Sequence, residues 1–96
     1  MATNGSPSSL SGKIVLVTGA SSGIGAGTAL HMAGLGCKLS LVARNVDQLE
    51  AVAKLCRTAG SEDVLVCPHD LSLEEECIAA VEETVNHFGG EELWYC

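Results

Sequence analysis

The stretch VTGASSGIG, residues 17–25, decides the fold of this 96-residue chain. It places three glycines directly after the apolar run KIVLVT, residues 13–18, and before an alanine-rich segment, residues 24–35. The apolar run is typical of a strand buried on both faces, and the alanine-rich segment predicts a helix that ends at Gly36. A glycine-rich turn between a strand and a helix brings free backbone N–H groups and the positive end of a helix dipole together, which suits a phosphate group.

Strand and helix signals continue to alternate after this first pair. Residues 38–43 and 63–67 predict a second and a third strand. Asn45 with Gln48 predicts the start of a second helix, which Gly60 ends, and Ser72 with Glu75 predicts the start of a third. The expected apolar faces are Val46, Leu49, Val52 and Cys56 on the second helix, and Cys77, Ile78, Val81, Val85 and Phe88 on the third. The order βαβαβα predicts an α/β fold: an incomplete Rossmann-type parallel sheet of three strands with helices on both faces.

Composition and charge exclude several classes of function. The chain is 47% hydrophobic but has one Trp, one Tyr and one Phe, so its core must be built from aliphatic residues and cysteine. Five basic and five acidic residues balance through Asp70, and all seven remaining acidic residues are glutamates after it. Without a basic cluster, neither nucleic acid nor an anionic membrane is an expected partner.

The cysteines and the N-terminal segment bear on location. Five cysteines, at positions 37, 56, 67, 77 and 96, show no C-x-x-C spacing and are expected to be small buried hydrophobes in a reducing compartment. The polar segment 1–11 has neither a basic start nor an apolar run, so it is expected to be a flexible leader. We therefore expect a cytoplasmic protein. None of His31, His69 and His87 has a metal partner at a recognisable spacing, and no metal site is expected.

Two kinds of phosphate loop could account for residues 17–25. A P-loop needs Lys and then Ser or Thr after its last glycine, but Gly25 is followed by Ala26 and Gly27. The dinucleotide-binding alternative needs a buried strand before the loop, a helix after it and a ribose-contacting residue about 20 positions further on, and all three are present.

The segment Thr18-Gly19-Ala20-Ser21-Ser22-Gly23-Ile24-Gly25 resembles the coenzyme loop of the short-chain dehydrogenase/reductase family, in its single-domain branch. Asp70-Leu71, just after the third strand, resembles the acidic–apolar pair with which that family contacts the adenine ring; a turn residue before the third helix is the alternative for Asp70. The resemblance covers residues 12–90 and implies a nicotinamide coenzyme. The cofactor-binding residues it implies are Thr18, Gly19, Ser21, Ser22, Gly23, Ile24, Gly25, Arg44, Asn45, Asp70 and Leu71.

Charge at the end of the second strand predicts which coenzyme binds. Enzymes that prefer NAD place a carboxylate there, which accepts the ribose hydroxyls and repels a 2′-phosphate. Here Arg44 stands nineteen positions after Gly25, followed by Asn45. A guanidinium can pair with a phosphate, so we predict NADP(H) over NAD(H). An exposed arginine at a helix entrance is the alternative.

The resemblance also implies catalytic residues that this chain lacks. The family transfers hydride between the nicotinamide and a carbonyl or alcohol with a Ser, a Tyr and a Lys four positions after that Tyr. The sole tyrosine, Tyr95, precedes the last residue, so we assign no catalytic residue and expect no hydride transfer. Small carbonyl or alcohol substrates are expected only for a longer form.

The chain departs from the family pattern after Gly90. A fourth apolar strand is expected there, but residues 91–96 read EELWYC, and we interpret them as a divergent tail after a nucleotide-binding unit, residues 12–90. Loss of the fourth strand would leave residues 13–18 as an exposed edge, through which the chain could self-associate. The predicted function is the NADP(H)-binding portion of an oxidoreductase. Alternatives are a non-enzymatic nucleotide-binding or edge-pairing fragment and an unstable truncated product.

Overall fold

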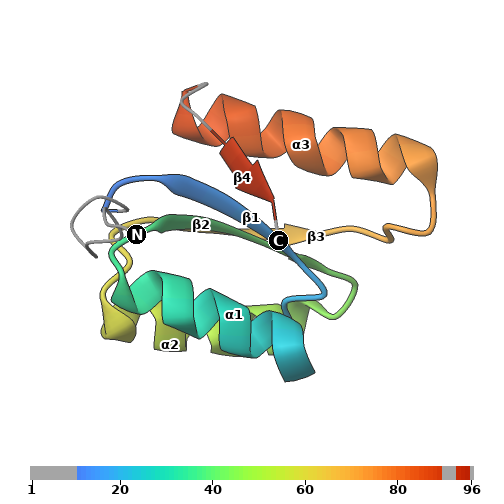
Figure 1. Ribbon diagram of the computed structural model, residues 1–96. Coiled ribbons are helices and arrows are strands. Elements are labelled where there is room, and N and C mark those ends of the chain that lie inside the picture. Colours follow the sequence, from blue (N-terminus) through green and yellow to red (C-terminus); the bar gives the residue numbers. More distant parts are fainter. Residues whose placement is uncertain (1–10, 90–92, 96) are drawn as a thin grey trace.

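The computed structural model describes residues 11–89 and 93–95, and it confirms the α/β fold class (Figure 1). The elements, in chain order, are β1 (Ile14–Thr18), α1 (Gly23–Gly34), β2 (Lys38–Ala43), α2 (Val46–Ala59), β3 (Val64–Pro68), α3 (Glu74–Phe88) and β4 (Leu93–Tyr95). The helices and the first three strands lie within one residue of the predicted bounds, except that α3 starts two residues after the predicted cap. The predicted leader, residues 1–11, falls outside the described residues except for Ser11.

One parallel sheet organises the molecule, with the strand order β3-β2-β1-β4. Helices α1 and α2 cover one face of this sheet and α3 covers the other (Figure 1). Connections between parallel strands are right-handed, so β2 and β3, added on one side of β1, leave α1 and α2 on the same face. After β3 the chain crosses back to add β4 on the other side of β1, which places α3 on the opposite face. The carboxyl ends of β1, β2 and β3 therefore lie along the same edge of the sheet.

The prediction of an uncovered β1 edge is wrong for half of that strand. Leu93–Tyr95 forms β4 and pairs in parallel with β1, with Ile14 opposite Leu93 and Leu16 opposite Tyr95. Aromatic and branched residues favour extended backbone, so this tail can form strand hydrogen bonds although its sequence departs from the family pattern. Residues Ile14–Leu16 are therefore not an exposed edge, and the reason for predicting self-association does not apply to them.

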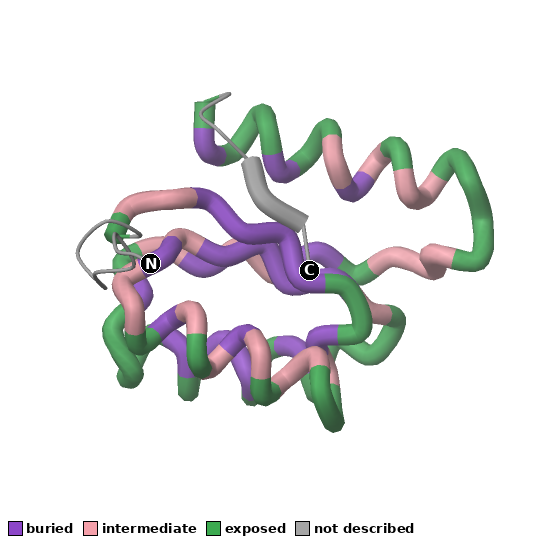
Figure 2. The backbone as a smooth tube through the Cα atoms, viewed as in Figure 1, coloured by how far each residue is buried: buried purple, intermediate pink, exposed green. Residues whose placement is uncertain are grey.

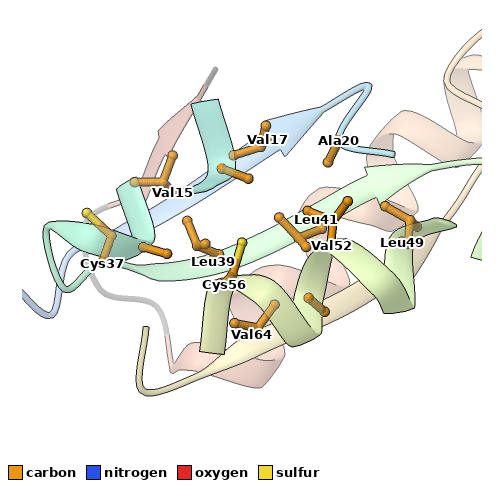
Figure 3. Packing of buried hydrophobic residues seen from close by; sticks show 13 residues of the cluster. Val15, Val17, Ala20, Cys37, Leu39, Leu41, Leu49, Val52, Cys56 and Val64 are labelled. Carbon is orange, nitrogen blue, oxygen red and sulfur yellow. The ribbon is translucent and has the colours of Figure 1, made fainter. Parts of the chain in front are cut away.

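The larger core lies between the sheet and the helix pair α1 and α2. Alternate strand residues point to this side, among them Val15, Val17, Leu39 and Leu41, and they pack against small residues of α1 and larger ones of α2 (Figure 3). The purple segments of Figure 2 show how burial concentrates in β1 and β2. The expected face of α2 is confirmed at Leu49, Val52 and Cys56, whereas Val46 is exposed. Asn45 caps α2 as predicted, since its side-chain oxygen accepts the backbone N–H of Gln48 at 3.0 Å.

The smaller core lies under α3, and here the predicted helix face is partly wrong. Leu16, Val42, Cys67 and Ala80 form its buried cluster. The buried positions of α3 are Ala80, Thr84 and Phe88, while Ile78 and Val85 are exposed by 51% and 40%. The helix is rotated from the predicted orientation because Thr84, a polar residue, finds hydrogen bonds inside the core. No side-chain hydrogen bond caps α3, so the predicted Ser72–Glu75 capping box is also wrong.

A buried pair of hydroxyls ties α3 to the sheet. The hydroxyl of Thr84 donates to the carbonyl of Ala80 at 2.7 Å, so Ser40 on β2 donates to Thr84, also at 2.7 Å. Both side chains are fully buried. Thr84→Val would leave the buried hydroxyl of Ser40 with neither water nor Thr84 as hydrogen-bond acceptor. We therefore expect this substitution to lower the free energy of unfolding by about 1–3 kcal/mol.

The double variant Ser40→Ala/Thr84→Val should be more stable than Thr84→Val alone, since it removes both members of the pair. Urea unfolding of the two single variants and the double variant, followed by circular dichroism, measures the coupling. Additive losses would contradict the pairing.

Candidate functional site

The carboxyl ends of three strands meet at an open cleft of about 380 Å³. Gly19 and Ser21 contribute from the β1–α1 loop, Ala43, Arg44, Asn45 and Gln48 from the end of β2 and the start of α2, and His69, Asp70 and Leu71 from the segment after β3. In open parallel sheets, ligands bind outside the carboxyl ends of the strands where the direction of chain growth reverses. The cleft has that position.

Two glycines give the loop its shape for different reasons. Gly19 has φ of +61°, in the left-handed region where a side chain causes strain, and a Cβ there would meet nothing within 4 Å. Gly25 is needed for close packing of α1 against the end of β1, because a Cβ on it would collide with the carbonyl group of Gly19. The open space beside Gly19 lets a ligand approach the backbone closely.

The first N–H groups of α1 have neither a side-chain cap from Ser22 nor an acidic residue in the same turn. Ser22 is the N-cap residue, and its backbone is extended. Ile24, in that turn, is 90% exposed. An uncompensated helix start suits an anionic group, and an exposed large apolar side chain beside it suits contact with a ligand.

Arg44 is the basic residue that lines the cleft. Its side chain is exposed, and none of the hydrogen bonds or ion pairs found among residues 11–89 uses its guanidinium group. Asn45 beside it is engaged through its side-chain oxygen in capping α2. The cleft therefore has one cationic group available to a ligand at the end of β2.

Asp70 forms the turn before α3, which was the alternative role considered for it. Its Oδ1 accepts the hydroxyl of Ser72 at 2.7 Å and the backbone N–H of Ser72 at 3.0 Å. These two bonds, with a smaller contribution from the charge of Arg44, lower the pKa of Asp70. Asp70 is thus ionised at neutral pH, and in the described part of the chain its Oδ2 accepts no hydrogen bond.

Six of the eleven predicted cofactor-binding residues line the cleft together: Gly19, Ser21, Arg44, Asn45, Asp70 and Leu71. Thr18, Ser22, Gly23, Ile24 and Gly25 do not line it, but they follow one another along the end of β1 and the start of α1. Sequence reasoning missed Ala43, Gln48 and His69. Their positions beside Arg44 and Asp70 at strand ends were the available signal.

His69 is held between two glutamates of α3, neither of which lies at a recognisable sequence spacing from it. Its Nδ1 lies 3.2 Å from Oε1 of Glu76, and its Nε2 lies 2.9 Å from Oε2 of Glu83. The thiol of Cys67 donates to Oε1 of Glu83 at 3.2 Å. Burial, with the neighbouring Glu83, raises the pKa of Cys67 to about 12, and the hydrogen bonds from Cys67 and then His69 lower the pKa of Glu83.

The other cysteines and histidines play smaller parts. Cys37, Cys56 and Cys67 are buried, as predicted, Cys77 is half-buried, and none of these four forms a disulfide within the described part of the chain. His87 lies at the far end of α3, where its Nε2 is 3.1 Å from Oδ1 of Asp63. The described residues include no helix long and apolar enough to cross a membrane.

Comparison with known families agrees with this geometry. The profile of the family described as short chain dehydrogenase matches residues 13–94, which is most of the chain. The chain belongs to the short-chain dehydrogenase family. Members of this family bind a nicotinamide dinucleotide.

Individual relatives support the assignment over the same portion. "11-beta-hydroxysteroid dehydrogenase-like 2" of Arabidopsis thaliana is 51% identical over 80 residues, which are 83% of this chain and 26% of that protein. The structure of L-sorbose reductase from Gluconobacter frateurii complexed with NADPH and L-sorbose has a TM-score of 0.77 and 40% identity, and the match covers 83% of this chain and 30% of that one.

A second solved structure similar to this chain holds the other coenzyme. The 3-ketoacyl-(acyl-carrier-protein) reductase from Brucella melitensis was solved complexed with NADH; it has a TM-score of 0.74 and 38% identity, covering 83% of this chain and 31% of that one. The fold is therefore common to binders of both coenzymes. The chain spans about a quarter of the length of the curated relative in Arabidopsis.

Proposed function

We propose that this chain binds NADP(H), as the adenosine-binding portion of a short-chain oxidoreductase that acts on a carbonyl or alcohol. The observation that carries the proposal is the cationic group of Arg44, which lines the cleft and, among residues 11–89, makes no hydrogen bond or ion pair and only a weak charge interaction with Asp70. A ligand with a 2′-phosphate supplies a bidentate partner for a guanidinium, whereas a ribose hydroxyl does not. The absence of a carboxylate at this strand end also removes the repulsion that would disfavour that phosphate.

The remaining residues of the cleft suit the rest of an adenine dinucleotide. The uncompensated start of α1 and the open backbone beside Gly19 suit its diphosphate. Leu71 offers an apolar surface for the adenine ring, and the free Oδ2 of Asp70 can accept a hydrogen bond from its amino group. When bound, such a coenzyme supplies the hydride for reduction of a carbonyl.

Hydride transfer is proposed for the complete fold of the family, of which this chain spans 26% in the Arabidopsis relative and 30% in L-sorbose reductase. The relatives in Arabidopsis are named hydroxysteroid dehydrogenases, and alcohol–carbonyl interconversion is the reaction class we propose for a form that carries the complete fold.

Ligand-induced thermal stabilisation tests coenzyme binding by the 96-residue chain. We expect NADPH and 2′,5′-ADP to raise its melting temperature, because a ligand at about ten times its Kd adds about 1.4 kcal/mol, worth several degrees in a domain of this size. Adenosine, which lacks both phosphates, is the matched control and should shift it far less. Unchanged melting at millimolar NADPH and 2′,5′-ADP would contradict the proposal, and carbonyl reduction by the pure chain would contradict the assignment of catalysis to a longer form.

A further inference from the structure

Three side chains with metal-binding atoms converge where β3 ends under α3. Sγ of Cys67, a ring nitrogen of His69 and a carboxylate oxygen of Glu83 all lie within 4.8 Å of one another. Cys67 and His69 are two residues apart in extended backbone, so both side chains point to the α3 face of the sheet. His69 keeps that geometry beyond the strand, because its backbone N–H donates to the carbonyl of Ala43 at 3.0 Å.

The fourth member of the cluster, Glu76, orients the histidine. Glu76 and Glu83 are two helical turns apart on α3, and they contact opposite nitrogens of the His69 ring. Oε1 of Glu76 also accepts the backbone N–H of Asp70 at 2.8 Å, which fixes the carboxylate in place. In metal sites a ligating histidine usually donates its other ring N–H to a carboxylate in this way, and that bond sets its tautomer. With Nδ1 bonded to Glu76, Nε2 is directed toward Glu83 and is available as a ligand.

We propose that Cys67, His69 and Glu83 form a binding site for one divalent transition-metal ion, with zinc as the ion that fits best. Thiolate, imidazole and carboxylate are the three side-chain ligands that zinc accepts in tetrahedral sites. Three protein ligands leave the fourth position to water or another small molecule. On binding, the Cys67 thiol gives its proton to solvent and its sulfur bonds the metal, while Nε2 of His69 and the Glu83 carboxylate each donate an electron pair.

The cluster needs only small movements to close around an ion. Zinc–sulfur bonds are about 2.3 Å and zinc–nitrogen bonds about 2.0–2.1 Å, so ligand atoms about 3.5 Å apart surround the metal. Glu83 is the most exposed of the three and has the most room to adjust, with 51% of its side chain exposed compared with 14% for His69. Its exposure also gives an ion a path from solvent to the buried sulfur of Cys67.

A bound ion would join the end of β3 to the middle of α3 and fix His69, which lines the cleft next to Asp70. This inference is independent of the coenzyme proposal, since none of the three ligands is needed for the charge or glycine arguments made for NADP(H).

Cobalt(II) titration of the full 96-residue chain, in a thiol-free reductant, tests the site. We expect one Co²⁺ per chain to give a thiolate-to-metal absorption band, which Zn²⁺ then abolishes by displacing it. Cys67→Ser should lose the band, and His69→Gln and Glu83→Gln should need at least tenfold more Co²⁺ to produce it. The controls Cys77→Ser and His87→Gln, which leave the cluster intact, should behave as the unaltered chain.

Two outcomes would overturn the proposal. One is no thiolate band at any Co²⁺ concentration. The other is equal loss of the band in Cys77→Ser and Cys67→Ser, as in a chain whose thiols bind metal without a formed site. Glu83→Gln changes an exposed side chain to one of the same shape, so its fold can be compared directly by circular dichroism. Glu76→Gln, which alters the orienting residue alone, is expected to weaken metal binding about 10–100-fold without removing the band.

Discussion

Gly25→Ala is expected to lower the free energy of unfolding by about 3 kcal/mol or more, the largest effect of any substitution considered for this chain. The added methyl group would collide with the backbone carbonyl of Gly19, and a backbone atom at that position cannot move aside as a flexible side chain can. Relief requires α1 to shift away from the end of β1, which would open the core formed by Ala29 and Ala33. Denaturant unfolding, followed by circular dichroism, measures the loss.

Gly27→Ala is the matched control on the same helix. A Cβ at Gly27 meets nothing within 4 Å, and its backbone is helical, so alanine there should stabilise the chain by about 0.5–1 kcal/mol. Equal stabilities for the two variants would show that α1 does not pack against the loop as closely as the structure places it. The pair therefore separates the close approach of helix and strand from the general cost of glycine in a helix.

The helices and the first three strands could be predicted from the sequence because their signals are local. The bounds of β2 could be predicted residue for residue, since the stretch KLSLVA between Cys37 and Arg44 is rich in Leu and Val and has the length of a strand. Asn45 could be identified as a cap because its oxygen needs only the N–H of Gln48, three residues away. Both are properties of neighbouring residues, and no tertiary contact competes with them.

Tertiary contacts decided the features that the sequence predicted wrongly. The orientation of α3 depends on Thr84, whose hydroxyl is satisfied only because Ser40 lies opposite it in the folded sheet. Ser72 does not cap α3, because the helix starts at Glu74 with Leu73 as its N-cap, and the hydroxyl of Ser72 donates back to Asp70. β4 forms because β1 offers it an unpaired edge, although the tail sequence alone indicated a break.

The candidate site also has a part that could be predicted from the sequence and a part that could not. The glycine loop and Arg44 were predictable because each has a fixed distance along the chain from a strand end. The cluster of Cys67, His69 and Glu83 was not, because fourteen residues separate His69 from Glu83 and only the packing of α3 on the sheet brings them together. Metal spacing within one element is visible in a sequence, whereas spacing between a strand and a helix is not.

Arg44→Ala is expected to lower the affinity for NADPH and for 2′,5′-ADP about 10–100-fold, while changing the affinity for NADH and 5′-AMP less than about threefold. A charge-assisted hydrogen bond contributes about 1.5–3 kcal/mol, and 1.4 kcal/mol corresponds to a factor of ten in Kd. 2′,5′-ADP and 5′-AMP differ only in the 2′-phosphate, so the ratio of their Kd values isolates the interaction assigned to the guanidinium. Isothermal titration at fixed ionic strength gives both constants, and salt should weaken the 2′,5′-ADP complex more.

Lys54→Ala supplies the control, because it removes the same charge from an exposed position of α2 that does not line the cleft. If that variant lost 2′,5′-ADP affinity as strongly as Arg44→Ala, the preference would arise from net charge and not from a contact at the end of β2. If the ratio of the two Kd values stayed constant in Arg44→Ala, the NADP(H) assignment would fail. The cleft would then serve either coenzyme, because the glycine loop and Asp70 suit the parts that NADPH and NADH share.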